Sequence, residues 1–125
     1  MSQEPYKILT IDDDPDILEA LRTLLEAKGY EVIQAESAEE GLKALKANHP
    51  DLVIVDLMME EVDAGTSFVT RVRALGGKRI PIYMLSSVGD ELSKNVPYQG
   101  LGLSGVFQKP IQPQTLLQVL EQALD

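Results

Sequence analysis

The sequence has 125 residues, of which 44% are apolar and 25% are charged, a composition typical of one globular domain. Its formal charge of −9 argues against direct binding to nucleic acid or to an anionic membrane, because both require basic residues. Cysteine is absent, which excludes disulfides, thiol catalysis and thiolate metal sites.

Short β-branched runs, which predict buried strands, alternate along the chain with segments of helical period. The first run, Lys7–Ile11, precedes a helical segment that opens at Pro15, a residue suited to the first helical turn. The second run, Glu31–Ala35, precedes a segment in which Ser37 and Glu40 have capping-box spacing. The helix from Pro15 is expected to bury one apolar face, formed by Ile17, Leu18, Leu21, Leu24 and Leu25.

The same alternation continues through the second half of the chain. Asp51–Asp56 predicts a third strand, residues 66–75 a helix, Ile80–Ser86 a fourth strand and Gly105–Gln108 a fifth, and the last helix begins near Pro113. The inner face of that helix is expected to consist of Leu116, Leu117, Leu120 and Leu124. Between the fourth and fifth strands, Pro97, Gly100 and Gly102 disfavour a regular helix, so a short or irregular one is expected there.

This alternation predicts an α/β fold: a five-stranded parallel sheet, doubly wound, of the flavodoxin-like (βα)5 type. No internal repeat or low-complexity linker divides the sequence, so residues 1–125 are expected to form a single domain. The N-terminus has no signal-peptide pattern and no apolar run reaches membrane-spanning length, which leads us to expect a cytoplasmic protein without membrane contact.

Polar residues that can carry chemistry stand at the carboxyl ends of the predicted strands. Asp12 and Asp13 follow the first strand, Asp56 ends the third, Ser86 ends the fourth and Lys109 follows the fifth. Ligands of such sheets bind beyond these ends, near the point where the strand order reverses. The five residues are therefore expected to form one site.

Three carboxylates at one edge repel one another unless a cation joins them. Oxygen ligands without histidine or cysteine favour Mg²⁺, which keeps several waters and leaves room for a phosphate oxygen. Lys109 can add a second positive charge at that phosphate, and Ser86 a hydroxyl donor. A carboxylate that faces a phosphoryl donor beside Mg²⁺ can act as a nucleophile and form an acyl phosphate.

The motifs ILTIDDDPDI, DLVIVDLMM, PIYMLSS and VFQKPI fall in the order and near the spacing of a known family. Over nearly its whole length the chain resembles the receiver domain of bacterial two-component response regulators, of the stand-alone chemotaxis type. The resemblance implies that Asp56 is the phosphoacceptor. It also implies that Asp13, Asp56 and the backbone carbonyl of Met58 hold Mg²⁺, with Asp12 acting mainly through a metal-bound water.

The same resemblance assigns Ser86 as the switch hydroxyl and Lys109 as the phosphate-contacting lysine, with a cis Lys109-Pro110 peptide bond. It implies a sensor histidine kinase as phosphodonor, and a downstream protein target or a histidine phosphotransfer protein as the next partner. Self-phosphorylation from phosphodonors and slow autodephosphorylation are expected, rather than the turnover of a conventional enzyme.

Two departures from the family pattern bear on the mechanism. Glu60 stands where the family usually has proline, and Ala64 replaces the aspartate of an aspartate-glycine pair. Val106 occupies the place of the usual aromatic switch residue, and Phe107 follows it. Because side chains alternate across a strand, Phe107 is expected to point the opposite way, into the core.

Other interpretations of the sequence remain open. A pseudo-receiver would bind partners without phosphorylation, although such proteins usually lack one of the residues present here. A Mg²⁺-dependent phosphohydrolase of the haloacid dehalogenase type would use Asp12 and Asp14 as a D-x-D motif, but it calls for an acidic pair after the lysine, where only Glu121 and Asp125 remain. The chain could also be part of a longer regulator.

Overall fold

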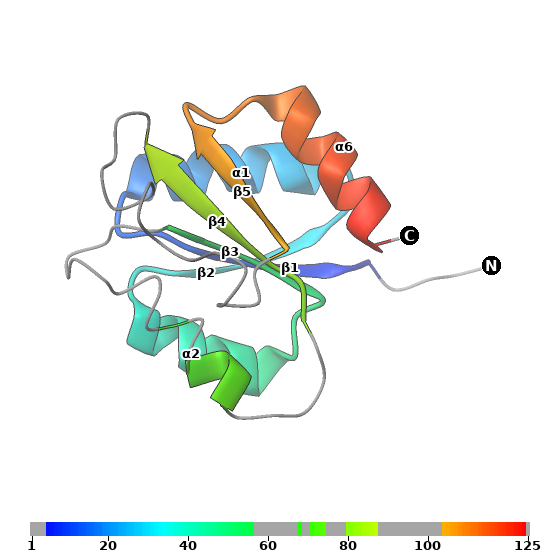
Figure 1. The fold of residues 1–125 in the computed structure, drawn as a ribbon. Coiled ribbons are helices and arrows are strands. Elements are labelled where there is room, and N and C mark those ends of the chain that lie inside the picture. The colour runs from blue at the N-terminus through cyan, green and yellow to red at the C-terminus, as the bar shows by residue number, and fades with distance from the viewer. Residues whose placement is uncertain (1–4, 57–67, 69–70, 75–79, 88–103, 125) are drawn as a thin grey trace.

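The strands of the chain form one parallel sheet in a computed structural model that describes residues 5–56, 68, 71–74, 80–87 and 104–124 (Figure 1). The strand order is β2-β1-β3-β4-β5, and each neighbouring pair is parallel. This confirms the predicted five-stranded parallel sheet. The elements are β1 (Lys7–Ile11), α1 (Pro15–Ala27), β2 (Glu31–Ala35), α2 (Ala38–Asn48), β3 (Leu52–Asp56), β4 (Ile82–Ser87), β5 (Gly105–Lys109) and α6 (Pro113–Leu124).

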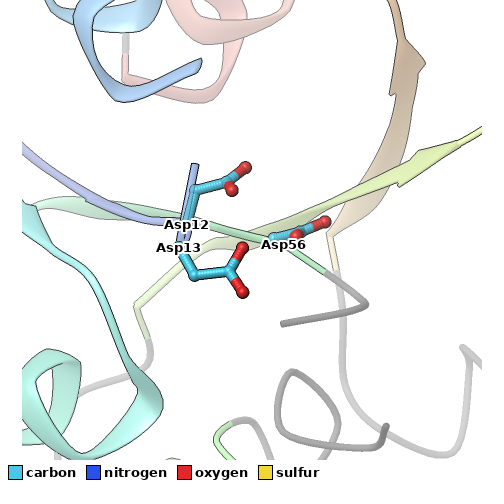
Figure 2. Close-up of side chains that lie close together, drawn as sticks. All are labelled: Asp12, Asp13 and Asp56. Atoms are coloured by element: carbon cyan, nitrogen blue, oxygen red, sulfur yellow. The ribbon is translucent and has the colours of Figure 1, made fainter. Parts of the chain in front are cut away.

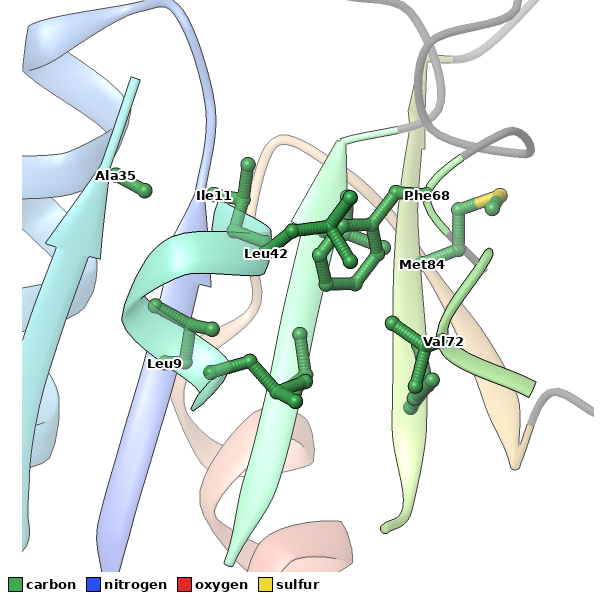
Figure 3. Close-up of a cluster of buried hydrophobic side chains, with 11 residues drawn as sticks. Leu9, Ile11, Ala35, Leu42, Phe68, Val72 and Met84 are labelled. Carbon is green, nitrogen blue, oxygen red and sulfur yellow. The ribbon is translucent and has the colours of Figure 1, made fainter. Parts of the chain in front are cut away.

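Helices cover both faces of the sheet, as expected for a doubly wound fold (Figure 1). On the first face, α2 and the helical residues 68 and 71–74 pack on a buried cluster (Figure 3) of Leu9, Ile11, Ala35, Leu42, Leu45, Val53, Val55, Phe68, Val72, Ile82 and Met84. On the second face, α1 and α6 pack on a cluster of Ile8, Leu21, Leu25, Leu52, Ile54, Tyr83, Leu85, Leu116 and Leu120. β1 and β3 are buried between these layers and position the residues that follow them.

The helix termini follow the local sequence. The side chain of Asp14 caps α1 by accepting a hydrogen bond from the backbone N–H of Asp16. Ser37 caps α2 by accepting one from Glu40 at 3.1 Å. After α1, Gly29 has a φ of 89°, a left-handed conformation that glycine adopts without strain.

Some strand boundaries differ from those predicted. Asp51 lies just before β3, where its carboxylate accepts a hydrogen bond of 2.8 Å from the backbone N–H of Lys7. β4 is displaced by two residues at its start, and β5 extends to Lys109. These differences are small, because the apolar pattern defines the middle of a strand better than its ends.

The irregular helix expected around Pro97 and the loop that contains Glu60 and Ala64 lie outside the described residues. The helix expected over residues 66–75 is described at residues 68 and 71–74, and these are helical. Among the helices that the structure describes, none is long and apolar enough to span a membrane.

Candidate functional site: an acidic cluster joined by Lys109

The site lies where the order of the strands reverses. β1 is flanked by β2 and β3, and the chain crosses to opposite sides of β1 to form these pairs. Ile11 of β1 pairs with Val55 of β3. The next residues along the two strands, Asp12 and Asp56, therefore lie side by side. A parallel sheet offers its ligand-binding crevice at this point.

Asp12, Asp13 and Asp56 converge at this edge (Figure 2), with one carboxylate oxygen of each lying within 4.8 Å of the others. Asp12 is fully buried and Asp56 is 4% exposed, whereas Asp13 is exposed. The cluster therefore combines two buried carboxylates with one that is exposed.

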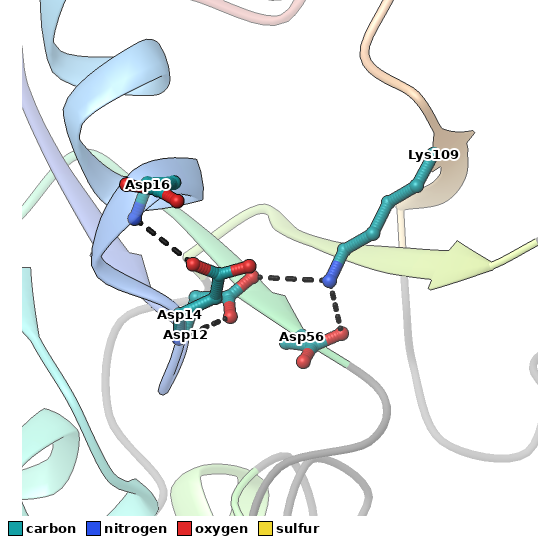
Figure 4. Close-up of polar contacts among 5 residues, drawn as sticks. All are labelled: Asp12, Asp14, Asp16, Asp56 and Lys109. Carbon is teal, nitrogen blue, oxygen red and sulfur yellow. Dashed lines mark hydrogen bonds and ion pairs between the residues drawn. The ribbon is translucent and has the colours of Figure 1, made fainter.

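Lys109 reaches across the sheet edge from β5 and joins two of these carboxylates (Figure 4). Its Nζ lies 3.2 Å from Oδ1 of Asp56 and 3.3 Å from Oδ2 of Asp12. Burial lowers the pKa of Lys109, but the charges of Asp56 and Asp12 outweigh this effect and raise the pKa above 10.5. Lys109 is therefore protonated at neutral pH.

Asp12 is held by the segment that follows it. Its Oδ1 accepts a hydrogen bond of 2.9 Å from the backbone N–H of Asp14, the residue that caps α1. Its Oδ2 is buried and is paired with the ammonium of Lys109 at 3.3 Å. Burial raises the pKa of Asp12 above 3.8, although the Asp14 N–H and Lys109 oppose that shift.

These features fit a hard divalent cation. The three carboxylates supply oxygen ligands only, which suits Mg²⁺ rather than zinc or copper. Lys109 neutralises one negative charge of three, and the buried Oδ2 of Asp12 retains capacity to accept. A cation would relieve the repulsion that remains among the carboxylates.

The remaining residues of the predicted site lie as follows. Ser86 is buried near the end of β4, and Met58 lies outside the described residues. The Lys109-Pro110 peptide bond is cis, as predicted. Val106 is 37% exposed, whereas Phe107 packs against the cluster under α1 and α6, which confirms the predicted orientation of Phe107.

Sequence reasoning missed two contacts. The hydrogen bond from Asp14 to Asp12 had a local signal, because an aspartate that accepts from the N–H two residues later is a common turn. The other contact is a ring stack between Tyr83 of β4 and Phe107 of β5, with centroids 5.2 Å apart. It had no local signal, because it depends on how two strands are aligned.

The fold and this sheet edge define a doubly wound α/β domain with a cation-compatible acidic site. The sequence matches the response regulator receiver domain family over residues 8–121. The chain therefore belongs to that family, whose members typically bind Mg²⁺ at such an aspartate cluster.

Similar proteins agree with this assignment. The chain is 34% identical over all its 125 residues to the transcriptional regulatory protein GlrR of Escherichia coli, but it spans only 28% of that protein's length. It is also 34% identical to an uncharacterized 14.6 kDa protein of Leptolyngbya boryana, with 92% of this chain and 87% of that protein covered. The chemotaxis response regulator CheY4 of Vibrio cholerae superposes with a TM-score of 0.84 at 32% identity, covering 96% of this chain and 99% of that one.

Proposed function

We propose that residues 1–125 act as one phosphoacceptor receiver domain of a two-component system, with Asp56 as the phosphorylated residue. The observation that carries the proposal is that Asp56 lies 3.2 Å from the ammonium of Lys109 and clusters with the carboxylates of Asp12 and Asp13. Lys109 contacts both Asp12 and Asp56, and of these two carboxylates Asp56 is the one that ends the central strand β3.

In the proposed reaction, an oxygen of Asp56 attacks the phosphorus of a phosphohistidine on a kinase or phosphotransfer protein. The P–N bond breaks, and the histidine leaves as Asp56 becomes an acyl phosphate. Lys109, whose pKa is raised by the charges of Asp56 and Asp12, is proposed to bind an oxygen of the transferred group through its ammonium. Ser86, at the end of β4, is proposed to donate its hydroxyl to the same group.

Mg²⁺, when bound, would neutralise charge on the phosphoryl oxygens. We assign Asp13 and Asp56 to hold it directly, together with the Met58 carbonyl that the resemblance implies, and Asp12 to act through a water. Loss of the phosphoryl group to water returns the resting state slowly.

We further propose that the phosphorylated domain acts by contact with another protein. The charge of −9 opposes a nucleic-acid target. The domain is proposed to function alone. The alternative is a receiver within a longer chain, since the match to GlrR covers only 28% of that protein's length. The phosphohydrolase alternative is less well supported, because Asp14 caps α1 instead of facing Asp12 as an acid–base group.

Intact mass after incubation with acetyl phosphate and MgCl₂ tests the proposal. One added phosphoryl group is expected on the wild type and none on Asp56→Asn. Asp51→Asn is the matched control, because Asp51 stands before the opposite end of β3 and its carboxylate contacts Lys7; it should be phosphorylated like the wild type. Binding of Mg²⁺ without any mass increase would refute phosphoacceptor function and favour a pseudo-receiver.

A further inference from the structure

A pair of stacked aromatic rings joins strands β4 and β5, and one of them, Phe107, stands two residues before Lys109. The rings of Tyr83 and Phe107 are 5.2 Å apart and inclined by 25°. Tyr83 belongs to the buried cluster beneath α1 and α6, and Phe107 packs against that cluster. The stack therefore ties β5 to the core of one face of the sheet.

Gly105 makes this stack possible. It pairs with Tyr83 across the two strands, and a Cβ at Gly105 would lie 3.0 Å from Cε2 and 3.1 Å from Cδ2 of the tyrosine ring. The ring of Tyr83 thus passes over the bare backbone of Gly105 and reaches Phe107. A side chain at position 105 would occupy that path.

Lys109 lies on the same side of β5 as Gly105 and Phe107. Alternate residues of a strand share one side, and Gly105, Phe107 and Lys109 are all partly buried while Val106 and Gln108 are exposed. β5 is an edge strand that pairs with β4 alone among the described strands, so the side-chain contacts on this side add to that one pairing in fixing its position. Two residues after Phe107, Lys109 contacts both Asp12 and Asp56.

We propose that the stack of Tyr83 and Phe107 positions Lys109 at the phosphoacceptor, which makes both aromatic residues positioning residues for the phosphoryl transfer proposed above. This inference rests on that proposed function. Because Val106 is exposed and on the other side of β5, the stack couples Lys109 to the α1 and α6 face.

The first test compares Phe107→Leu with Val106→Ala, two apolar truncations on opposite sides of one strand. With acetyl phosphate and saturating MgCl₂, Phe107→Leu should be phosphorylated about two- to tenfold more slowly, the range that corresponds to the free energy of an aromatic pair. Val106→Ala should keep the wild-type rate, and Phe107→Tyr, which retains the ring, should restore it. Equal rates for Phe107→Leu and Val106→Ala would overturn the proposal.

Affinity for Mg²⁺, titrated without a phosphodonor, separates positioning from general damage. A displaced ammonium no longer competes with the cation for the carboxylates, so Phe107→Leu should bind Mg²⁺ at least as tightly as the wild type, and Lys109→Ala tighter still. Weaker binding by Phe107→Leu would indicate a distorted site and would refute positioning. In the Lys109→Ala background, Phe107→Leu should change neither rate nor affinity; an undiminished effect there would also refute it.

These two measurements distinguish the inference from the function on which it rests. If the wild type binds Mg²⁺ but takes no phosphoryl group, the proposed function fails, while tighter Mg²⁺ binding by Phe107→Leu still supports the positioning of Lys109. If the wild type is phosphorylated and Phe107→Leu matches it in both rate and affinity, the function stands and the positioning role is refuted.

Discussion

Removal of the Lys109 charge should destabilise the domain in a manner that depends on both pH and metal. In the folded chain its Nζ lies 3.2 and 3.3 Å from two carboxylates that are nearly inaccessible to water. At an effective dielectric constant of about 20, each contact corresponds to about 5 kcal/mol of Coulomb attraction, part of which is offset by desolvation of the ammonium. Lys109→Gln leaves Asp12 and Asp56 without this cation.

Protonation of Asp12 limits the resulting loss of stability. To neutralise a carboxyl with an unfolded pKa of 3.8 costs about 4.4 kcal/mol at pH 7 and about 1.6 kcal/mol at pH 5. We therefore expect Lys109→Gln to lower the free energy of unfolding by about 2–4 kcal/mol at pH 7 in metal-free buffer, in keeping with broken buried pairs. The loss should be smaller at pH 5.

The linkage between proton binding and unfolding gives the direction of this pH dependence. Without Lys109 the folded pKa of Asp12 rises further above 3.8, so the stability from this group is complete below pH 3.8 and is lost as the pH rises through the folded pKa. Mg²⁺ at about 100 times its dissociation constant should add roughly 2.7 kcal/mol to the wild type and more to the variant, because the cation replaces the missing charge.

Urea unfolding at pH 5 and pH 7, with and without MgCl₂, measures these differences. Lys43→Gln is the control, because it makes the same change in net charge where the ion pair with Glu39 is 77% exposed on both sides and is worth less than about 1 kcal/mol. An equal loss for Lys109→Gln at both pH values, or one unaffected by Mg²⁺, would show that the electrostatic reasoning is wrong.

Three further substitutions test separate features of the structure. Asp12→Asn should raise the melting temperature at pH 7 in metal-free buffer but not at pH 3, because burial raises the pKa of Asp12 and penalises only its ionised form; a lower melting temperature at pH 7 would contradict this. Gly41→Ala should cost about 1–3 kcal/mol of stability by overpacking, since a Cβ there would overlap Cδ1 of Ile11. Ile11→Val removes that atom, so denaturant unfolding of the double variant should show much of the loss recovered. Ser37→Ala should cost about 1 kcal/mol through loss of the α2 cap, whereas Ser37→Asp should unfold like the wild type; equal losses for both would exclude capping as the cause.

Sequence patterns were sufficient to predict the sheet and the residues that meet at its edge. Continuous apolar runs such as Leu52–Val55 are typical of strands buried on both faces, and the parallel topology brings their carboxyl ends together. Asp12 and Asp56 could therefore be placed beside Lys109 before any distance was known. The start of β3 was predicted one residue early, because the hydrogen bond between Asp51 and Lys7 that occupies this position joins residues 44 apart.

Details of the site could not be predicted in the same way. The two ion pairs of Lys109, with Asp12 and with Asp56, depend on the backbone positions of three strands. No local sequence pattern predicts them. The stack of Tyr83 on Phe107 depends on the alignment of Tyr83 with Gly105, which hydrophobic periodicity leaves undetermined. Such contacts follow from register, and register is set by the packing of the whole sheet.

The order in which the chain is synthesised separates the charges of this site in time. Asp12 and Asp13 leave the ribosome near the start of the domain and Asp56 near its middle, whereas Lys109 belongs to the last of the five strands. Until β5 joins the sheet edge, the nascent domain holds three carboxylates without their lysine. Addition of β5 completes the sheet and brings the positive side chain that contacts two of these carboxylates.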